Sequence, residues 1–473
     1  MIDLVFLGFF GFVLMLGLRR PFIWVLLYVY IDILAPQKIG YTLIQSVQVS
    51  LIAFAAAFGG WLLLDDKRGA KFSVRQGLIL ALLLYCWWTT GSADFAESAG
   101  TKWEWVWKAL LFGIFLPFTL TTRLRIEALA MTLILAVGAI VISAGIKIVL
   151  GGGGYENKLF FVNDNSGIYE SSTLATVAIA LIPMVVWFTR HGTIFKPDWR
   201  VKTFALGLIF ASLLIPVGTE ARTGLLCIAA LAILALRDVK KRLMFLAAGA
   251  VLGLAALPFL PQSYYDRMAT LAEPGGDESA STRVAVWEWT IDYASRNPFG
   301  GGFDAYRGNS FTYELPVKDE VGNTTSVEFR EVVDEGRAYH SAVFEMLGEQ
   351  GWPGLSVWLL LHGLGVWHME RIRSRWRGRT AEGETWQAPM AQALQIASLI
   401  YLVGALFQGI AYQPVVLMIV GLQIALYNQC KQHDSQVQEN AREVRKFRGP
   451  RRSAGGKRRG KGKAEDGDAV AAG

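Results

Sequence analysis

The stretch GRAYHSAVFEMLGEQGWPGLSVWLLL, residues 336–361, passes from a charged loop directly into an apolar helix. Its apolar residues continue to the end of the quoted segment, which predicts a helix that enters a membrane here. Three ionisable side chains stand at the entrance: His340, Glu345 and Glu349. Such groups are costly in membrane helices and mark functional sites. The stretch therefore predicts both a membrane fold and the position of a site.

The composition of the whole chain supports a membrane fold. Hydrophobic residues make up 53% of the 473 residues and charged residues only 18%, and the mean hydropathy is +0.35. These values are too apolar for an ordinary soluble protein. A membrane helix needs about 20 mainly apolar residues, and many segments meet or approach that length. We predict an all-α polytopic membrane protein with about 12–13 transmembrane helices.

The distribution of lysine and arginine predicts how the chain crosses the membrane. Basic turns alternate along the chain with connections that are poor in Lys and Arg. The poor connections are APQKIGY from Ala35, GSADFAESAGTK from Gly91, GGGGYENKLFFVNDNSGIYE from Gly151, GTEAR from Gly218 and GIAYQP from Gly409. Because basic loops face the cytoplasm, the N-terminus is expected outside and the C-terminus inside. The first two apolar segments are short, and a re-entrant hairpin there would lower the count.

One connection is much longer than the others, running from Gln262 to Tyr339 on the predicted outer side. Loops of this length usually have a function. Its segment ESASTRVAVWEWTIDYASRNP, residues 278–298, predicts a helix that Ser281 or Thr282 caps and Asn297–Pro298 ends. One face of this helix suits the membrane interface and carries Val284, Trp287, Ile291 and Ala294. The three glycines 300–302 that follow are either a plain turn, which we favour, or a phosphate cradle.

These features divide the chain into five parts. We expect an N-terminal membrane domain (1–125), central membrane helices (126–261), the large external loop (262–340), C-terminal membrane helices (341–430) and a basic, disordered cytoplasmic tail (431–473). The tail is rich in Lys, Arg and Gly, which favours binding to anionic lipid head groups. No nucleic-acid partner is expected.

The ionisable residues at the helix entrance predict a polar cavity. Glu345 and Glu349 lie four residues apart on one helix face, where like charges repel. They therefore need water, a polar cavity or a cation beside them. Pro353 cannot donate a hydrogen bond to the carbonyl of Glu349, so the helix is expected to kink there. His340 is the only histidine on the predicted outer side, and a structural hydrogen bond is its alternative role.

Arginines supply the second part of the predicted site. Arg222 begins a span on the outer side, Arg283 begins the loop helix, and Arg307 lies further along the loop. A guanidinium group suits bidentate binding of phosphate, which predicts a lipid-linked phosphate substrate at the outer leaflet. Snorkelling of Arg222 towards the membrane surface is an equal alternative for that residue.

Three motifs resemble a known family in their order and spacing. TEARTG (219–224), STRVAVWEW (281–289) followed by RNPFGGGF (296–303), and YHSAVFEMLGEQGWPG (339–354) resemble the O-antigen ligase and polymerase family. Its members are multi-span bacterial glycosyltransferases with a large periplasmic loop. The first 41 residues are similar to the N-terminal domain of a subgroup, the O-glycosylation ligases associated with the exosortase A system. The resemblance covers roughly residues 1–430.

The resemblance implies a fold of the GT-C type and a specific reaction. The enzyme would transfer a glycan from undecaprenyl pyrophosphate to an acceptor hydroxyl at the periplasmic face of the bacterial inner membrane. The reaction would proceed with inversion, without a metal and without a cofactor. The acceptor would be a protein, a lipid or a growing polysaccharide, so the implied roles include protein O-glycosylation and exopolysaccharide assembly.

The resemblance also assigns roles to individual residues. The family's arginine at the start of a span corresponds to Arg222, its loop-helix arginine to Arg283, and its histidine after the loop to His340. Fixed cations suit the departing pyrophosphate, and a histidine suits the proton of the acceptor hydroxyl. Where other members often have Asn after the histidine, this chain has Ser341. Substrate contacts are expected from Arg222, Arg283, Arg307, Glu345, Glu349 and Asn165.

Two other functions remain open from the sequence. A polysaccharide polymerase would use the same donor chemistry with another lipid-linked repeat unit as acceptor. A transporter of lipid-linked glycans would more often show inverted repeats and charged residues at the bilayer midplane. The polar groups of this chain gather at one membrane face beside a long external loop, which favours an enzyme.

Overall fold

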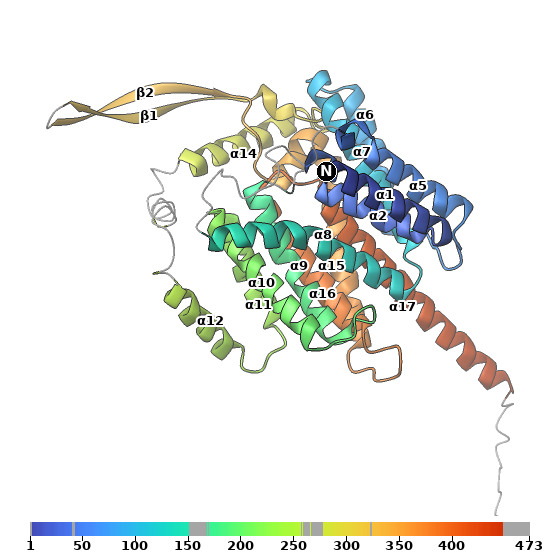
Figure 1. Cartoon of the computed structure of the whole chain (residues 1–473). Helices are drawn as coiled ribbons and strands as arrows, with labels where there is room; N and C mark the ends of the chain where they lie inside the picture. The colour runs from blue at the N-terminus through green and yellow to red at the C-terminus, as the bar shows by residue number, and fades with distance from the viewer. Residues whose placement is uncertain are drawn as a thin grey trace, which may run out of the picture. The chain divides into compact units, whose positions relative to one another are not determined.

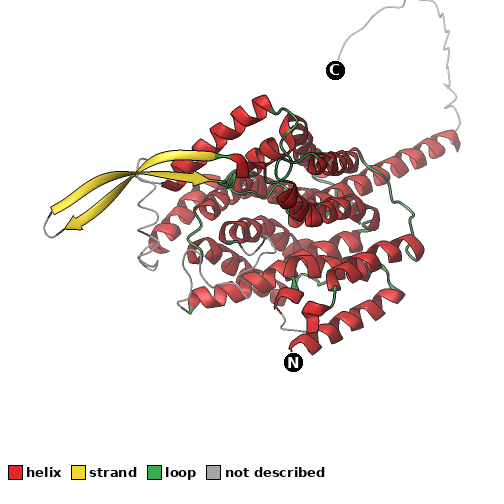
Figure 2. Ribbon diagram, turned by 90° about the horizontal axis from the view of Figure 1, so that it is seen from above, coloured by secondary structure: helices red, strands yellow, loops and turns green. Residues whose placement is uncertain are grey.

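The structure is a computed structural model that describes residues 2–39, 43–150, 168, 170–256, 258, 265, 278–321 and 324–447. The chain divides into two units, Met1–Cys430 and Lys431–Gly473. In the described part of the first unit, helices pack against one another and one β-hairpin extends away from them (Figures 1 and 2). The predicted all-α polytopic class is confirmed.

The helices of the first half follow one another with short connections. They are α1 (Ile2–Arg19), α2 (Phe22–Leu34), α3 (Pro36–Ile39), α4 (Leu43–Ser46), α5 (Val49–Leu63), α6 (Val74–Gly91), α7 (Ala96–Thr119), α8 (Arg123–Val149) and α9 (Ser171–His191). Two of them begin at side-chain caps: Ser73 caps α6 and Thr122 caps α8. Asp198 likewise caps the next helix, α10 (Trp199–Gly218), and all three caps lie in turns that are rich in Lys and Arg, residues 65–75, 121–125 and 190–202.

The second half contains the remaining helices and the hairpin. They are α11 (Arg222–Ala235), α12 (Arg242–Ala256), α14 (Glu278–Arg296), the 3-10 helix η2 (Ala305–Gly308), β1 (Ser310–Val321), β2 (Thr324–Glu335), α15 (Ala342–Trp376), α16 (Gln387–Ala405) and α17 (Pro414–Phe447). The first residues of the predicted disordered tail, 431–447, are instead helical and continue α17. Their sequence is rich in Gln, Glu, Arg and Lys and holds no Gly or Pro, so it favours a helix.

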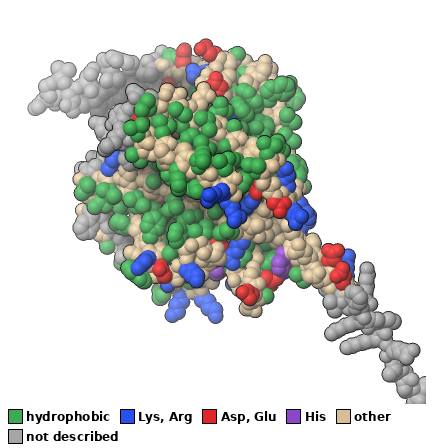
Figure 3. Space-filling model, turned by 45° about the vertical axis from the view of Figure 1, so that its right-hand side comes forward, with side chains coloured by type: hydrophobic (Ala, Val, Ile, Leu, Met, Phe, Trp, Pro, Cys, Tyr) green, Lys and Arg blue, Asp and Glu red, His purple; other side chains and the backbone are tan. Residues whose placement is uncertain are grey.

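Helices suited to a membrane are present throughout the described part of the first unit. Four of them, α8, α9, α10 and α16, are long and apolar enough to cross a membrane, and α2, α5, α11 and α12 are shorter apolar helices. On the face in Figure 3, hydrophobic side chains cover the middle of the first unit, and most visible Lys and Arg side chains gather below them. The chain is an integral membrane protein, and the number of 12–13 spans remains a prediction.

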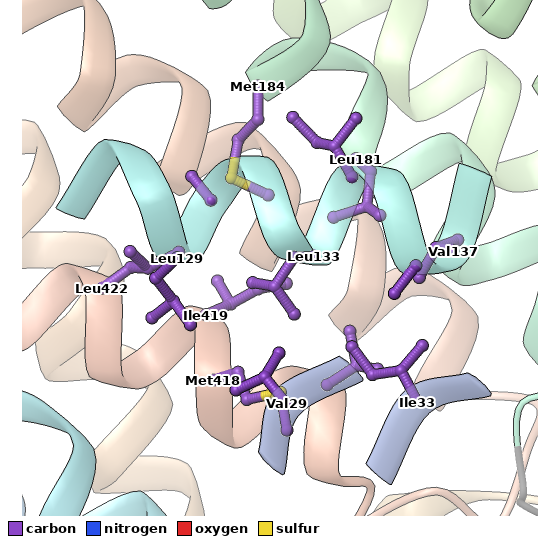
Figure 4. Close-up of a cluster of buried hydrophobic side chains, with 14 of the residues drawn as sticks. Val29, Ile33, Leu129, Leu133, Val137, Leu181, Met184, Met418, Ile419 and Leu422 are labelled. Atoms are coloured by element: carbon purple, nitrogen blue, oxygen red, sulfur yellow. The ribbon is translucent and has the colours of Figure 1, made fainter. Parts of the chain in front are cut away.

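A cluster of buried apolar side chains joins the N-terminal helices to the later ones. It takes residues from α2, α8, α9 and α17 that meet in one layer (Figure 4). In a membrane, this close packing rather than exclusion of water holds the helices together. The residues labelled in the figure are Val29, Ile33, Leu129, Leu133, Val137, Leu181, Met184, Met418, Ile419 and Leu422.

The helix that carries the predicted site, α15, is interrupted where the sequence predicted a kink. Gly351 has non-helical angles, φ 62° and ψ −166°, between Glu349 and Pro353. Pro353 has no N–H to donate to the carbonyl of Glu349. This carbonyl instead accepts a hydrogen bond from the N–H of Gly302 at 2.9 Å. The predicted kink is confirmed, and the external loop supplies the missing donor.

This contact decides the role of the three consecutive glycines. The N–H of Gly300 donates to the carbonyl of Asn297, and that of Gly301 to the carbonyl of Gly348, both at 3.0 Å. All three N–H groups are thus used within the protein, so the glycines form a turn and the alternative of a phosphate cradle is wrong. Gly300 has φ 84°, and a Cβ there would overlap the carbonyl of Glu349. Only glycine fits this approach.

The loop helix α14 is confirmed, but it begins at Glu278, so Ser281 and Thr282 lie within it and their predicted role as caps is wrong. The buried residues follow a spacing of four and are Thr282, Val286, Thr290 and Ala294. Val284 and Ile291, which were expected to face the membrane interface, are each 49% exposed, and this role stays a prediction. Trp287 stacks on Phe344 of α15 with ring centroids 4.9 Å apart. Contacts with the N-terminal end of α15 therefore set the orientation of α14. The periodicity of α14 alone carries no information about these contacts.

The hairpin of β1 and β2 was not predicted. The two strands pair antiparallel from Ser310 opposite Glu335 to Val321 opposite Thr324. Their sequence mixes β-branched residues, which favour strands, with many charged ones, which lower its hydrophobicity and hide the strands from a search for apolar segments. Pro316 is tolerated because both strands of the ribbon are edge strands.

Candidate active site

A cavity of about 1160 Å³ lies where the Lys- and Arg-poor connections meet. Four of the five connections singled out by their composition contribute to its wall, through residues 35–38, 95–102, 170 and 409–414. Asp304 and Arg307 of the long external loop complete this part of the wall. The connections predicted to share one side of the membrane therefore lie together around one cavity.

An ion cluster centred on Lys102 of α7 forms part of this wall. The Nζ of Lys102 lies 2.7 Å from Oε1 of Glu345 and 2.6 Å from Oε1 of Glu349. The carboxylate of Asp304 is 3.8 Å away. The side chain of Glu349 is fully buried and that of Glu345 is 7% exposed. Burial of two carboxylates is tolerated only with such a cation, which is one of the three neighbours that their spacing predicted.

The external loop holds the same cluster from the other side. The backbone N–H of Asp304 donates to Oε1 of Glu349 at 3.0 Å. The hydroxyl of Ser98 donates to the carboxylate of Asp304, and Nε of Arg307 donates to the hydroxyl oxygen of Ser98 at 3.0 Å. Arg307 lines the cavity with its side chain half exposed. The loop, α7 and α15 therefore form one connected polar network.

Glu345 connects the cluster to the turn before α17. Its Oε2 accepts a hydrogen bond from the backbone N–H of Ala411 at 2.9 Å. The adjacent carbonyl of Ile410 accepts from the hydroxyl of Tyr401 at 2.6 Å. Glu345 also lines the cavity, whereas Glu349 does not. The two carboxylates thus differ: Glu349 fixes the loop and the kink, and Glu345 is available to the cavity.

His340 lies just before α15 in a rare backbone conformation. Its φ is 46°, in the left-handed region that is uncommon for residues with a side chain. Burial lowers the pKa of its imidazole, and the nearby guanidinium groups of Arg283 and Arg337 lower it further. The neutral imidazole is therefore favoured, as a general base requires. Trp287 of α14 donates to the carbonyl of the preceding Tyr339 at 2.9 Å, which fixes the entry to α15.

The two arginines expected in the site stand on different helices. Arg283, near the start of α14, lies within electrostatic range of both His340 and Glu170. Burial raises the pKa of the Glu170 carboxyl, and Arg283 opposes this shift. Arg222 is the first residue of α11, which packs against α9 and α16. Arg283 and His340 therefore interact electrostatically, and Arg222 stays a predicted member of the site.

Strained backbone positions occur in the cavity wall and at or near two of the predicted residues. Among the described residues, four other than glycine have positive φ: Ala35, Glu220, Asp304 and His340. Ala35 and Asp304 line the cavity, Glu220 lies two residues before Arg222, and His340 is the predicted base. Such conformations cost about 1–3 kcal/mol each and concentrate at functional sites.

The structure brings some of the predicted residues together and separates others. Within the described part of the chain, Glu345 and Arg307 line the cavity, Glu349 lies behind its wall, and His340, Arg283 and Arg222 do not line it. Asn165 lies outside the described residues. The described residues include no group of three or more His, Cys, Asp or Glu side chains arranged to hold a metal.

Lys102, Asp304 and Ser98 were not among the site residues predicted from the sequence. The sequence carries a signal for Lys102, because this cation lies where a Lys-poor connection enters an apolar helix. The same criterion selects Asp32, the only charged residue of α2, and Lys108 of α7, both of which line the cavity.

Comparison with known families divides the chain in two. Residues 1–193 match a family of unknown function, DUF5935, and residues 206–359 match the family described as O-Antigen ligase. No curated protein matches the chain. The second match contains Arg222, Arg283, His340, Glu345 and Glu349, whereas Lys102 lies in the first.

Proposed function

The chain carries a domain of the O-antigen ligase family, and from this premise we propose that it is a membrane glycosyltransferase. The donor is a glycan on undecaprenyl pyrophosphate, and the acceptor is a hydroxyl group at the periplasmic face of the bacterial inner membrane. The C-terminus is then cytoplasmic, as the basic turns of the sequence indicate.

The proposed reaction is a single displacement with inversion. The acceptor oxygen attacks the anomeric carbon of the first sugar, and the bond from that carbon to the phosphate oxygen breaks. His340 takes the proton of the acceptor hydroxyl. Arg222 and Arg283 stabilise the negative charge that grows on the departing pyrophosphate, and this charge is larger in the transition state than in the ground state.

One observation carries this proposal: His340 has a half-buried position within electrostatic range of Arg283. The imidazole has a lowered pKa because of its burial and the neighbouring arginines, so it can accept a proton at neutral pH. A cation suited to pyrophosphate thus acts electrostatically on that base. Two guanidinium groups supply the positive charge that the leaving group requires, so the proposed reaction needs no metal.

The remaining predicted residues have supporting roles in the proposal. Glu345 and Arg307 contact the substrate from the cavity wall, and Glu349 fixes the kink of α15 and the loop. The similarity of the first 41 residues to the exosortase-associated subgroup supports protein O-glycosylation as the physiological reaction. A lipid or polysaccharide acceptor uses the same residues.

The direct test is transfer of a defined undecaprenyl-pyrophosphate-linked glycan by the purified full-length protein to candidate acceptors. Arg222→Ala, Arg283→Ala and His340→Asn should each lower turnover by about 100-fold or more. Arg296→Ala is the matched control, because this exposed arginine of α14 pairs with Asp292 one turn away. Wild-type turnover in the first three variants would contradict the assignment of the site.

The product of the same reaction separates the alternatives. A glycan on a protein or a non-prenyl lipid identifies a ligase, and a longer glycan still attached to undecaprenyl pyrophosphate identifies a polymerase. If the wild-type protein transfers to no acceptor but moves the donor across liposomes, it is a transporter and the proposed function is wrong.

A further inference from the structure

The wall of the cavity is built mostly from the part of the chain that matches the family of unknown function. Of its 25 lining residues, 17 lie within residues 1–193, on α2, α3, α5, α7 and the start of α9. The ligase domain contributes Asp304, Arg307 and Glu345, and the turn before α17 completes the wall. The cavity therefore needs both parts of the chain.

The charges on this wall do not suit a phosphate group alone. Five acidic and four basic side chains line the cavity, so its formal charge is slightly negative. A pyrophosphate site needs an excess of cations, as the predicted arginines would provide. Interspersed donors and acceptors suit instead a neutral ligand with many hydroxyl groups, because each hydroxyl both donates and accepts hydrogen bonds.

Aromatic side chains add a second feature that suits sugars. Trp105 of α7 lines the cavity and is 44% exposed, so its ring has a surface that is not covered by protein. Tyr28, Phe95 and Tyr412 also belong to the wall. Aromatic rings combine a large apolar face with nearby polar groups, and the C–H faces of sugar rings stack on such surfaces.

Asp32 provides a polar group deep in this wall. It is the only charged residue in the apolar helix α2, and its Oδ1 lies 3.5 Å from the hydroxyl of Tyr28. An ionisable residue in an apolar helix is costly and marks a functional position. Asp32 has no part in the proposed chemistry at His340, so it needs another function.

The volume of the cavity indicates the size of the ligand that it can hold. Its volume of about 1160 Å³ lies above the range of about 300–1,000 Å³ usual for sites of drug-sized ligands. A cavity of this size accommodates several linked sugar units. Glu345 belongs both to the cavity wall and to the ion cluster at the start of α15, so a glycan in the cavity lies beside the predicted site.

We infer that this cavity binds sugar residues of the glycan and that the N-terminal segment, through Trp105 and Asp32, forms the main part of the sugar-binding wall. This inference rests on the proposed function, because the bound saccharide belongs either to the lipid-linked donor or to a glycosylated acceptor. The two sources share the same chemistry of ring faces and hydroxyl groups.

The test measures binding separately from turnover. Full-length protein in lipid nanodiscs is titrated calorimetrically with two probes: the free oligosaccharide released by mild acid from the polyprenyl-linked donor, and the saccharide portion of the acceptor. Trp105→Ala and Asp32→Asn should weaken binding of one probe by about tenfold or more. Trp105→Phe, which keeps an aromatic face, should restore most of the affinity. The probe that responds identifies the source.

Trp87→Ala is the matched control, because Trp87 is a 65% exposed tryptophan of α6 outside the cavity wall, and it should bind like wild type. If neither saccharide binds, or if both bind equally to wild type, Trp105→Ala and Asp32→Asn, the inference is wrong. Turnover of the wild-type protein in the same nanodiscs is measured in parallel. If the wild-type protein transfers the glycan but Trp105→Ala and Asp32→Asn bind the saccharides like wild type, only the sugar-binding wall is refuted. If these two variants bind more weakly but the wild-type protein transfers to no acceptor, the wall is supported and the proposed function is refuted.

Discussion

Lys102 on α7 and Glu349 on α15 form a buried ion pair, with Nζ and Oε1 2.6 Å apart. The pair joins the segment that matches a family of unknown function to the segment that matches the O-antigen ligase family. Because Glu349 also accepts the N–H of Asp304, one cation and one carboxylate connect three parts of the fold.

Removal of the cation should destabilise the protein strongly. Lys102→Met leaves Glu345 and Glu349 buried without a counter-ion, and breaking a buried pair in this way costs about 3–5 kcal/mol. The double variant Lys102→Met/Glu349→Gln should recover part of this loss, because one uncompensated charge is gone. Thermal unfolding in detergent, followed by tryptophan fluorescence, measures both effects. Lys202→Met, at an exposed lysine of α10, serves as the control, and equal melting temperatures for Lys202→Met and Lys102→Met would contradict the role of the pair.

The contact between the glycine turn and the kink of α15 should tolerate no side chain. Gly300→Ala adds both a strained left-handed conformation and a Cβ that overlaps the carbonyl of Glu349. Gly378→Ala isolates the first effect, because Gly378 has a similar φ of 80° and nothing within 4 Å of an added Cβ. Gly378→Ala should cost about 1–2 kcal/mol, and Gly300→Ala clearly more. Similar unfolding temperatures for the two variants would show that the turn can move away from α15.

The pH dependence of transfer should follow the charges near His340. Burial lowers the pKa of His340, and Arg283 and Arg337 lower it further because they disfavour the imidazolium. Arg337→Gln removes one of these charges, so the pKa should rise towards its ordinary value. A general base is active only when neutral, so activity of the variant should fall at a higher pH than in wild type as the solution is acidified. Profiles of kcat/KM against pH measure the shift, and Arg296→Gln should show none. A shift in the opposite direction would exclude His340 as the base.

The backbone of His340 allows its chemical role to be separated from its structural one. His340→Asn keeps a residue that tolerates the left-handed region, whereas His340→Ala does not. Both variants should lose about 100-fold or more of the transfer rate, because both lack the base. Only His340→Ala should also lose about 1 kcal/mol or more of stability. If His340→Asn keeps wild-type turnover, the histidine has only a structural role.

Local sequence features predicted the parts of the fold that depend on local physics. The kink of α15 follows from Pro353 and the end of α14 from Asn297–Pro298, since proline acts on its own helix. The basic turns contain the caps Ser73 and Thr122, because helix starts and loop charges are both encoded within a few residues.

Features that depend on distant parts of the chain could not be predicted in the same way. The carboxylates of Glu345 and Glu349 indicated a missing cation, but Lys102 lies 243 residues before Glu345 and no periodicity connects them. The face of α14 was likewise set by Phe344 and Tyr339, which the pattern of α14 does not contain. The predicted roles of Arg222 and Asn165 stay predictions.

The distance along the chain between Lys102 and its carboxylates also sets an order of events during biosynthesis. Ribosomes add roughly 5–20 residues per second, so α15 emerges about 12–50 s after Lys102. In that interval α7 has already left the ribosome with a cation whose partners do not yet exist. Until Glu345 and Glu349 are synthesised, the flexible side chain of Lys102 can reach the membrane surface. The N-terminal helices therefore complete their assembly only after most of the chain has been translated. In a nascent chain that stops before α15, the charge of Lys102 stays uncompensated and is exposed to the quality-control machinery of the membrane.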